Sequence, residues 1–382
     1  MRIGIDCRKI YDIHLNKGAG VERYVYHLVK HLLTVGRNHE FILFVRADLS
    51  PETIHRLKGE HDRVKVVKQM TVVSQLPFIG NHFSFSRLLK KEKLDCAIFP
   101  ANVLPFFYWR KSILVIHDLA IYNHKEWFPE KQWLATKILV PWSIRRASLI
   151  AAVSESTKSD LIKLFKVKEQ KIQVIYPGVV VKESYTLEEV SAVLRKFDIK
   201  TDYALFLGTI EPRKNILNLI KAFSNYIFEN EESRINLVIA GIKGWKFGGV
   251  FRELNEFNNR LTSSRIKYIG KISNRERNIL IGNCQAFVFP SLYEGFGFPV
   301  LEAMALGAPV VTSNNSSLVE IATGASYLVD PYDVNDIRRG LKAVLEDKIL
   351  RYQLIAAGKE RVKDFDWNKT AAKFLELIEK TK

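Results

Sequence analysis

Two glutamates in one short segment are the first residues whose types and spacing could do chemistry. Glu294 and Glu302 lie eight residues apart in PSLYEGFGFPVLEAM, with two glycines and a proline between them. Pro299 fits the first turn of a helix and Gly307 fits the position just past its end, which predicts a helix over 299–306. Glu302 would then lie in the first turn and Glu294 in the preceding loop. The two carboxylates could converge on a ligand held at the helix N-terminus.

The glycines between these carboxylates favour a binding role. Gly295 and Gly297 permit backbone conformations that present N–H groups to phosphate or sugar hydroxyls. Glu302 alone has a structural explanation, because the helix dipole favours acids in a first turn. That explanation does not account for Glu294 and the paired glycines, so the functional interpretation is preferred here.

A second segment carries two adjacent cations. GTIEPRKN, residues 208–215, follows an apolar strand-like run and places Arg213 and Lys214 just before a helical pattern. Fixed positive charge and free N–H groups at a helix start suit a diphosphate. The string is also typical of an ordinary exposed helix start, and from this segment alone the structural explanation is favoured.

The first half of the chain adds two weaker candidates. Gly18 and Gly20 lie in a glycine-containing loop, KGAGVERYVYHL, which could cover a ligand but is also typical of a tight turn. His117 and Asp118 end a buried-looking strand, VIHDLA, at the edge where ligands bind in parallel sheets. A purely structural role for this histidine is an equal alternative.

The elements that must position these residues form two alternating series. Short β-branched runs predict strands at 2–6, 40–45, 63–67, 95–100, 112–118 and 149–154, then at 203–208, 235–241, 266–270, 286–291 and 308–313. Strands that alternate with helical patterns indicate parallel sheets covered by helices. We therefore expect an α/β fold with two Rossmann-like, doubly wound domains facing each other across a cleft.

The predicted domains span 1–180 and 181–365. The strand pattern weakens over 180–202, which we interpret as the connection between the domains. A helix at about 366–382 is expected to pack back on the first domain.

The composition indicates a soluble globular protein. Of 382 residues 47% are hydrophobic, and no apolar run approaches the roughly 20 residues that span a bilayer. The first residues, MRIGIDCRKI, have no signal-peptide pattern. Cys7, Cys96 and Cys284 lack metal-ligand spacing and lie in or beside apolar runs, as expected for core thiols in a reducing compartment. We expect a cytoplasmic protein.

The positive charge is concentrated in the first half. The net charge is +17; residues 1–180 carry 29 Lys/Arg against 16 Asp/Glu, and residues 181–382 carry 29 against 25. Phospholipid, nucleic acid and anionic substrates all fit such an excess, and ordinary solubility charge explains it equally well. Leu76–Lys93 mixes large apolar residues with a basic end, so it could contact anionic lipid or simply pack on its own domain.

Taken together, these segments resemble the GT-B glycosyltransferases, specifically the large retaining family 4 that includes many bacterial mannosyltransferases. The resemblance covers nearly the whole chain, and the Glu-x7-Glu segment with EGFG is its most specific part. The matching segments are GAGVERYVYHL, HDLAIYNHKEWFPE, AAVSESTKSDL, GTIEPRKN, YIGKIS, FVFPSLYEGFGFPVLEAMALGAPVVTSN and LVDPYDV.

The resemblance implies a nucleotide-diphosphate sugar as donor substrate and no bound metal or other cofactor. Glu302 would hold the donor's ribose hydroxyls. Glu294 would contact the sugar hydroxyls, helped by Gly295 and by N–H groups near Phe296 and Gly297.

Further roles follow from the same resemblance. Arg213 and Lys214 would neutralise the departing diphosphate, and His117 would approach the donor sugar from the first domain. The remaining implied contacts are Gly18–Gly20 closing over the phosphates and Lys271 and Ile272, after Gly270, on the base.

The chain departs from the family pattern in its phosphate loop. Several members carry an arginine directly after the first glycine of this loop, Gly208, where this chain has Thr209. Either Arg213 and Lys214 suffice for the diphosphate, or another cation compensates.

The resulting prediction is a retaining, metal-independent hexosyltransferase. Mannose from GDP-mannose is the favoured donor group, and a glycan or lipid-linked acceptor of bacterial surface polysaccharide or lipopolysaccharide assembly is expected. An anionic membrane surface is a further candidate partner, which would place the protein peripherally on the inner face of the cytoplasmic membrane. A nucleotide-sugar epimerase of the same architecture is the main alternative. A nucleic-acid-binding protein would need aromatic–basic interleaving or a known motif, and neither is found.

Overall fold

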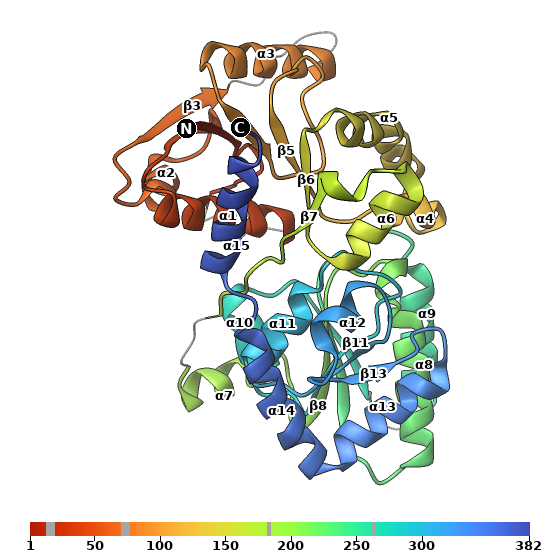
Figure 1. Cartoon of the computed structure of the whole chain (residues 1–382). Coiled ribbons are helices and arrows are strands. Elements are labelled where there is room, and N and C mark those ends of the chain that lie inside the picture. Colours follow the sequence, from red (N-terminus) through yellow and green to blue (C-terminus); the bar gives the residue numbers. More distant parts are fainter. Residues whose placement is uncertain (13–19, 70–76, 182–184, 262–263) are drawn as a thin grey trace. The chain divides into compact units, whose positions relative to one another are not determined.

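The computed structural model describes residues 1–12, 20–69, 77–181, 185–261 and 264–382, without the side chains of 77–80 and 131–135. These residues form two compact units (Figure 1). One contains residues 1–125, 130–178 and 365–382, and the other contains 126–129 and 179–364.

The first unit is built on a seven-stranded parallel sheet of order β3-β2-β1-β4-β5-β6-β7. Its strands are β1 (Arg2–Asp6), β2 (Glu40–Arg46), β3 (Val64–Gln69), β4 (Cys96–Phe99), β5 (Ser112–Ile116), β6 (Leu149–Ala152) and β7 (Ile172–Val174). Its helices are α1 (Gly20–Val35), α2 (Pro51–Lys58), α3 (Pro77–Lys91), α4 (Ala120–Asn123), α5 (Glu130–Arg146), α6 (Glu155–Phe165) and α15 (Trp367–Glu379).

The second unit has a six-stranded parallel sheet of order β10-β9-β8-β11-β12-β13. Its strands are β8 (Tyr203–Leu207), β9 (Asn236–Ala240), β10 (Ile266–Gly270), β11 (Ala286–Phe289), β12 (Val310–Ser313) and β13 (Tyr327–Val329). Its helices are α7 (Leu187–Lys196), α8 (Ile216–Glu229), α9 (Gly248–Asn259), α10 (Asn274–Gly282), α11 (Phe298–Ala305), α12 (Ser316–Ala322), α13 (Val334–Glu346) and α14 (Lys348–Val362).

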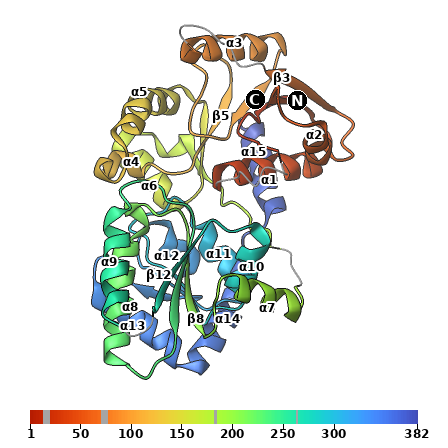
Figure 2. The same ribbon diagram turned by 180° about the vertical axis from the view of Figure 1, so that it is seen from behind.

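Central strands such as β5 and β11 are buried along their whole length because helices cover both faces of each sheet (Figures 1 and 2). Every residue of β5, SILVI, is buried, and so is every residue of β11, AFVF. A helix over the sheet needs only one apolar face: α1 buries Val25, Leu28 and Leu32 toward the core. The α/β class predicted from the alternating pattern is confirmed.

Some elements of the second unit were not predicted, among them α7 and β13. The supposed connection at 180–202 contains α7, which begins with a capping box: Thr186 accepts from the Glu189 N–H, and the Glu189 carboxylate accepts from the Thr186 N–H. The strand β13 was also missed, because three residues are too few to produce a periodic signal.

The units divide at Gly178/Val179, close to the predicted 180/181, but Glu126–Pro129 belongs to the second unit and not to the first. The physical reason is aromatic packing. Trp245 donates its indole N–H to the carbonyl of Trp127 at 2.5 Å, and its ring lies 6.2 Å from that of Phe128. A sequence pattern does not reveal such a contact between distant residues, so the assignment of Glu126–Pro129 to the second unit could not be predicted.

The helix α15 lies against α1 (Figure 1). Trp367, its first residue, stacks on the ring of His27 at 5.5 Å. A Cβ atom at Gly178 would lie 2.4 Å from the backbone nitrogen of Trp367, so this close approach requires glycine. Residues 365–382 therefore complete the core of the first unit.

The described part of Leu76–Lys93 is largely α3. Phe85 and Leu89 on this helix are buried in the first unit, whereas Phe83 is exposed. Leu76 lies outside the described residues. Among the helices of the described chain, none combines the length and hydropathy needed to cross a bilayer.

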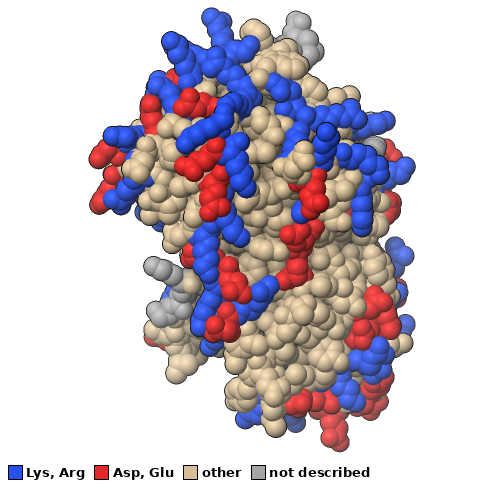
Figure 3. All heavy atoms as spheres, viewed as in Figure 1, with Lys and Arg blue, Asp and Glu red and all other residues tan. Residues whose placement is uncertain are grey.

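The three cysteine thiols are buried and free, as predicted for core residues. The charge asymmetry is visible on the surface, where Figure 3 shows Lys and Arg side chains gathered over the first unit.

The contact between α1 and α15 should make stability depend on pH. Burial, together with Arg23 and His31, lowers the pKa of His27 from its ordinary 6.5 to about 4. The unfolded chain therefore binds more protons between these values, and stability falls as pH falls.

We predict that His27 contributes about 2 kcal/mol to the loss of unfolding free energy between pH 7.5 and pH 5. In His27→Phe, which keeps an aromatic ring beside Trp367 but cannot titrate, urea unfolding should show that much less dependence on pH. The matched control His55→Phe changes an exposed histidine on α2. Equal pH dependence in wild type and His27→Phe would contradict the assignment.

Candidate functional site

The candidate residues of the second unit meet at the carboxyl edge of its sheet. The strand order reverses between β8 and β11, because the chain adds β9 and β10 on one side and β12 and β13 on the other. In open parallel sheets ligands bind beyond the strand ends at such a reversal. Arg213 and Lys214 come from the loop after β8, and Glu294 comes from the loop after β11.

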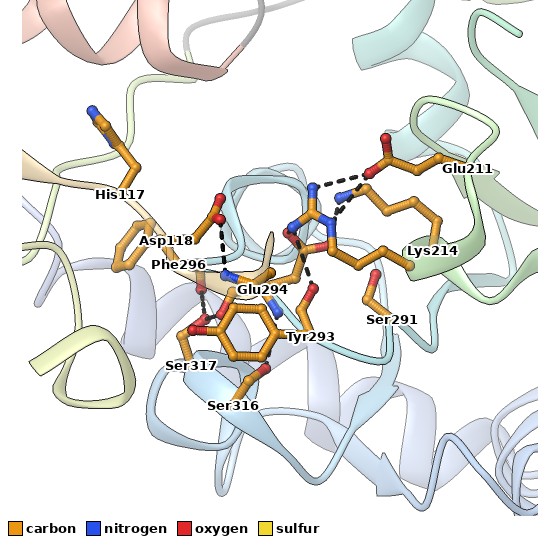
Figure 4. A network of polar contacts seen from close by, with 12 residues as sticks. His117, Asp118, Glu211, Lys214, Ser291, Tyr293, Glu294, Phe296, Ser316 and Ser317 are labelled. Atoms are coloured by element: carbon orange, nitrogen blue, oxygen red, sulfur yellow. Dashed lines mark hydrogen bonds and ion pairs between the residues drawn. The ribbon is translucent and has the colours of Figure 1, made fainter. Parts of the chain in front are cut away.

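A buried ion network joins these two loops (Figure 4). The Lys214 ammonium contacts Glu294 Oε1 at 2.5 Å, and Arg213 Nη1 contacts Glu294 Oε2 at 3.1 Å. Arg213 also reaches the buried Glu211 carboxylate at 3.0 Å and donates to the carbonyl of Tyr293 at 3.3 Å. Charges taken out of water are stable only when paired in this way.

Burial and ion pairing act in opposite directions on the pKa values of Glu294 and Lys214. Burial acts to raise the pKa of Glu294, but Arg213 and Lys214 outweigh it, and the net pKa lies below its usual value. Glu294 is therefore held as a carboxylate at neutral pH. Burial, reinforced by Arg213, lowers the pKa of Lys214 despite the attraction of Glu294.

The Lys214 ammonium keeps capacity for a ligand. Its nitrogen lies 5.0 Å from the centre of the Phe289 ring, and within the described chain Glu294 is its hydrogen-bond acceptor. An ammonium has three N–H donors. Two of them can therefore take oxygen atoms of an anion.

Asn215 ties three loops together behind the network. Its backbone adopts a left-handed conformation, with φ of 59°, which asparagine tolerates better than most residues. Its side-chain amide donates to the carbonyl of Pro290 at 3.0 Å and to that of Pro331 at 2.6 Å. Asn215 thus fixes the loops after β8, β11 and β13 relative to one another.

The segment with Gly208 and Thr209 is held by the loop after β9. Ile210 donates to the carbonyl of Ile242 at 2.9 Å, and Gly208 donates to that of Ala240 at 3.0 Å. A Cβ atom at Gly241, where φ is 146°, would lie 1.8 Å from the Gly208 carbonyl oxygen. This crossing requires glycine and fixes the loop that carries Thr209.

The EGFG turn is held from the start of α12. The hydroxyl of Ser317 donates to the carbonyls of Glu294 and Phe296, and the N–H of Glu294 donates to the hydroxyl of Ser316 (Figure 4). Gly297 has φ of 108° and precedes α11, as its permissive backbone allows.

Gly295 does not share this conformation, since it is not among the glycines with positive φ. The backbone freedom expected of both glycines is therefore used by Gly297 alone.

Glu302 is buried in α11. The prediction that it lies in the first turn is wrong, because the helix starts at Phe298 and Glu302 is its fifth residue. Its Oε2 lies 3.4 Å from Nη1 of Arg277, which comes from α10. The helix dipole therefore explains an acidic residue at this position less well than expected, and the ion pair with Arg277 explains it better. Arg277 was missed because in ISNRERN it reads as an ordinary polar residue of a helix start.

Lys271 and Ile272 follow Gly270 at the carboxyl end of β10, on the same edge of the sheet. The carbonyl of Gly270 accepts from the N–H of Gly241 at 2.8 Å, which connects the loops after β9 and β10. The next helix, α10, starts with a capping box made by Ser273 and Glu276.

The remaining candidates belong to the first unit. Gly20 begins α1, and Gly18 lies outside the described residues. His117 follows β5; its Nε2 lies 2.8 Å from the Pro100 carbonyl and its ring 4.7 Å from that of Tyr24. Burial lowers the pKa of His117. Because a carbonyl only accepts, the neutral ring carries its proton on Nε2 and leaves Nδ1 as an acceptor.

Within the described stretches, no group of three or more His, Cys, Asp and Glu side chains is arranged to hold a metal ion.

Comparisons with known proteins give matches over nearly the whole chain. Residues 18–183 match the model of Glycosyltransferase Family 4, and residues 193–361 match that of Glycosyl transferases group 1. O-antigen chain mannosyltransferase B of Escherichia coli is 33% identical over 261 residues, 67% of each chain. The serotype-specific mannosyltransferase WbdA of the same species is 29% identical over 71% of this chain, but the match spans only 33% of WbdA.

Two solved structures share the fold. Anabaena HepE, in complex with UDP-glucose, superposes with a TM-score of 0.76 at 17% identity over 100% of both chains. WaaG, a glycosyltransferase involved in lipopolysaccharide biosynthesis, gives 0.69 at 15% identity over 98% of this chain and 99% of its own.

The crossing at Gly241 leads to a stability prediction. Gly241→Ala should lower the free energy of unfolding by about 2–4 kcal/mol, because the new Cβ collides with the Gly208 carbonyl in a conformation unfavourable to alanine. Gly249→Ala is the matched control, since a Cβ there meets open space. The control should change stability by no more than about 1 kcal/mol in denaturant unfolding. Equal stability of the two variants would show that the chain can accommodate a side chain at position 241, contrary to this argument.

Proposed function

This chain belongs to the family 4, or group 1, glycosyltransferases, and on that premise we propose that it transfers mannose from GDP-mannose to a saccharide acceptor with retention of the anomeric configuration. Its two parallel-sheet α/β units are those of the GT-B architecture. The proposed acceptor is a glycan or lipid-linked saccharide of a bacterial surface polysaccharide, assembled on the cytoplasmic side of the membrane.

The observation that carries the proposal is the buried network of Arg213, Lys214 and Glu294 at the strand-order reversal. Two cations at this edge suit the diphosphate of a nucleotide sugar. The choice of mannose rests on the relatives, two of which are named mannosyltransferases and one of which is 33% identical.

The donor would lie along the carboxyl edge of the second sheet. Lys214 would offer its two remaining N–H bonds to the diphosphate, Glu302 would hold the ribose hydroxyls, and Lys271 and Ile272 would contact the base. Arg277, paired with Glu302 at 3.4 Å, would orient that carboxylate. The GDP-mannose is a substrate, and no metal or other cofactor is part of the proposal.

Glu294 would have two tasks at the same site. In the structure its carboxylate holds Arg213 and Lys214 in place. When a diphosphate takes up part of the positive charge, the carboxylate becomes available to hydroxyls of the donor sugar. His117 of the first unit keeps Nδ1 as an acceptor for a hydroxyl hydrogen bond, and its contact with the donor sugar stays a prediction.

In the transfer step, the bond between mannose C1 and the diphosphate oxygen breaks and a bond from C1 to the acceptor oxygen forms on the same face. GDP leaves with the bonding electron pair, and the acceptor proton passes to the departing phosphate oxygen. The transition state resembles an oxocarbenium ion, so the enzyme's main task is to stabilise charge on the leaving group. Glu294, held as a carboxylate by its cations, has no proton to donate.

A thermal-shift screen of nucleotide sugars tests the donor. At 100 times its Kd a ligand stabilises the native state by about 2.7 kcal/mol, so GDP-mannose should raise Tm clearly more than UDP-glucose at equal concentration. GDP should shift Tm as well, because the cations bind the diphosphate. A preference for UDP-sugars would overturn the donor assignment and leave the family intact.

Product analysis with and without acceptor tests the reaction. Retention should appear in the NMR coupling of the new anomeric proton, and transfer should continue in excess EDTA. An altered sugar nucleotide formed in the absence of acceptor would indicate an epimerase and contradict the proposal.

Lys214→Met should lower kcat by roughly 10²–10³, the usual cost of removing one donor that stabilises developing charge. The control Lys221→Met removes an exposed lysine of the following helix, α8, and should leave kcat unchanged. Circular dichroism and Tm check that both variants fold. A folded Lys214→Met enzyme with nearly full turnover would remove this residue from the mechanism.

A further inference from the structure

The first unit has an exposed aromatic and basic surface that the transfer reaction does not use. It is formed by three segments: α3, the loop 101–111 and α5. Four large apolar side chains on it are exposed: Phe83 by 57%, Phe107 by 39%, Trp109 by 62% and Ile138 by 67%. We refer to these segments as the aromatic–basic surface.

Ring contacts join the three segments into one continuous surface. Phe83 of α3 lies 5.7 Å from Phe107 of the loop. In the same loop, Phe106 lies 4.8 Å and Trp109 6.4 Å from Trp142 of α5. The exposed residues therefore belong to neighbouring parts of one unit and are not scattered over it.

Each of the two helices contributes one side to this surface. In α5, Ile138, Trp142 and Arg146 are spaced by four residues and so share one side of the helix; Ile138 is exposed, and Trp142 and Arg146 are half-buried. In α3, Phe83 and Arg87 are exposed, whereas the opposite side buries Phe85 and Leu89 in the core.

These segments are strongly basic. Together, α3, the loop 101–111 and α5 contain nine Lys or Arg and one acidic residue, Glu130, at the start of α5. By contrast, α13 and α14 of the second unit mix acidic and basic residues. One further acidic residue, Asp95, lies at the edge of the surface, where it lines a pocket together with Trp109 and Lys111.

The basic groups and the rings are arranged together. The Arg146 guanidinium lies 4.7 Å above the Trp109 ring and donates to the Trp109 carbonyl. Arg110, Lys111 and Lys137 are exposed beside them. Exposed Trp and Phe with flanking Arg and Lys are the chemistry of a protein surface that enters the headgroup region of an anionic bilayer.

We propose that the aromatic–basic surface binds the anionic face of a phospholipid bilayer, with Phe107 and Trp109 inserted among the headgroups. Ile138 favours lipid over nucleic acid as the partner, because an aliphatic side chain gains free energy from burial in acyl chains and nothing from stacking on bases. The sequence pattern assigns the lipid contact to Leu76–Lys93 alone. In the present proposal α3 supplies only Phe83 and Arg87, and the loop 101–111 and α5 supply the other residues that contact lipid.

Co-sedimentation with vesicles tests the proposal without donor or acceptor, so its failure would leave the proposed transfer reaction untouched. Wild-type protein should bind phosphatidylcholine vesicles containing phosphatidylglycerol at low salt, and bind pure phosphatidylcholine much more weakly. Binding to the anionic vesicles should fall as salt rises, since each Lys or Arg near the membrane contributes an attraction that salt screens.

Two sets of variants separate the apolar and the electrostatic contributions. Phe107→Ser with Trp109→Ser should weaken vesicle binding by roughly tenfold or more, because burial of either ring is worth at least that factor. Arg110→Glu with Lys137→Glu should weaken it by roughly tenfold or more at low salt and have little effect at high salt. Trp109→Phe, which keeps an aromatic ring, should retain most of the binding.

The matched control lies in the second unit. Lys348 and the exposed Tyr352 form a comparable basic–aromatic pair, with the Lys348 ammonium 5.9 Å from the ring centre. Lys348→Glu with Tyr352→Ser should bind vesicles like wild type. All variants should keep the circular dichroism spectrum and Tm of the wild type, which verifies that they are folded.

Three results would overturn the proposal. They are no binding of wild type to anionic vesicles at low salt, wild-type binding by the folded Phe107/Trp109 double variant, and saturable binding to duplex DNA or RNA in place of vesicles.

Discussion

The buried network of Lys214, Arg213 and Glu294 is the constraint on which the rest of the site depends. Three charged side chains from two loops are removed from water, and each is stable there only because the others are present. The two loops leave β8 and β11, neighbouring strands at the point where the strand order reverses. The network therefore fixes the spacing between these loops before any ligand arrives, and a ligand with negative charge enters a site whose cations are already oriented.

The surrounding backbone is built to keep that spacing. Asn215 joins the loops after β8, β11 and β13, and Gly241 lets the loop after β9 cross the Gly208 carbonyl closely. Ser317 holds the carbonyls of Glu294 and Phe296 from the start of α12. These contacts are short-range and directional, so they place polar groups more accurately than hydrophobic packing alone. Thr209 therefore lies in a loop that these backbone contacts hold in place.

Much of the fold followed from local pattern, and the parts that did not follow have physical reasons. Strands such as β5 and β11 are nearly continuous apolar runs, as expected for a sheet covered on both faces. The pairing of Glu294 with Lys214 could be anticipated only as proximity at one sheet edge, because an ion pair between residues 80 positions apart leaves no periodic signal. The Arg277–Glu302 pair and the transfer of Glu126–Pro129 to the second unit escaped prediction for the same reason.

The way the chain is divided between the units has a consequence for its synthesis. The first unit contains residues 1–125 and 130–178 but is completed by Phe365–Lys382, with Trp367 packed against Gly178 and His27. A ribosome makes Phe365–Lys382 only after all of Val179–Asp364 has been translated. Domains usually fold in the order in which they are translated. Here the unit whose translation begins first lacks part of its core until residues 365–382 have followed those of the second unit.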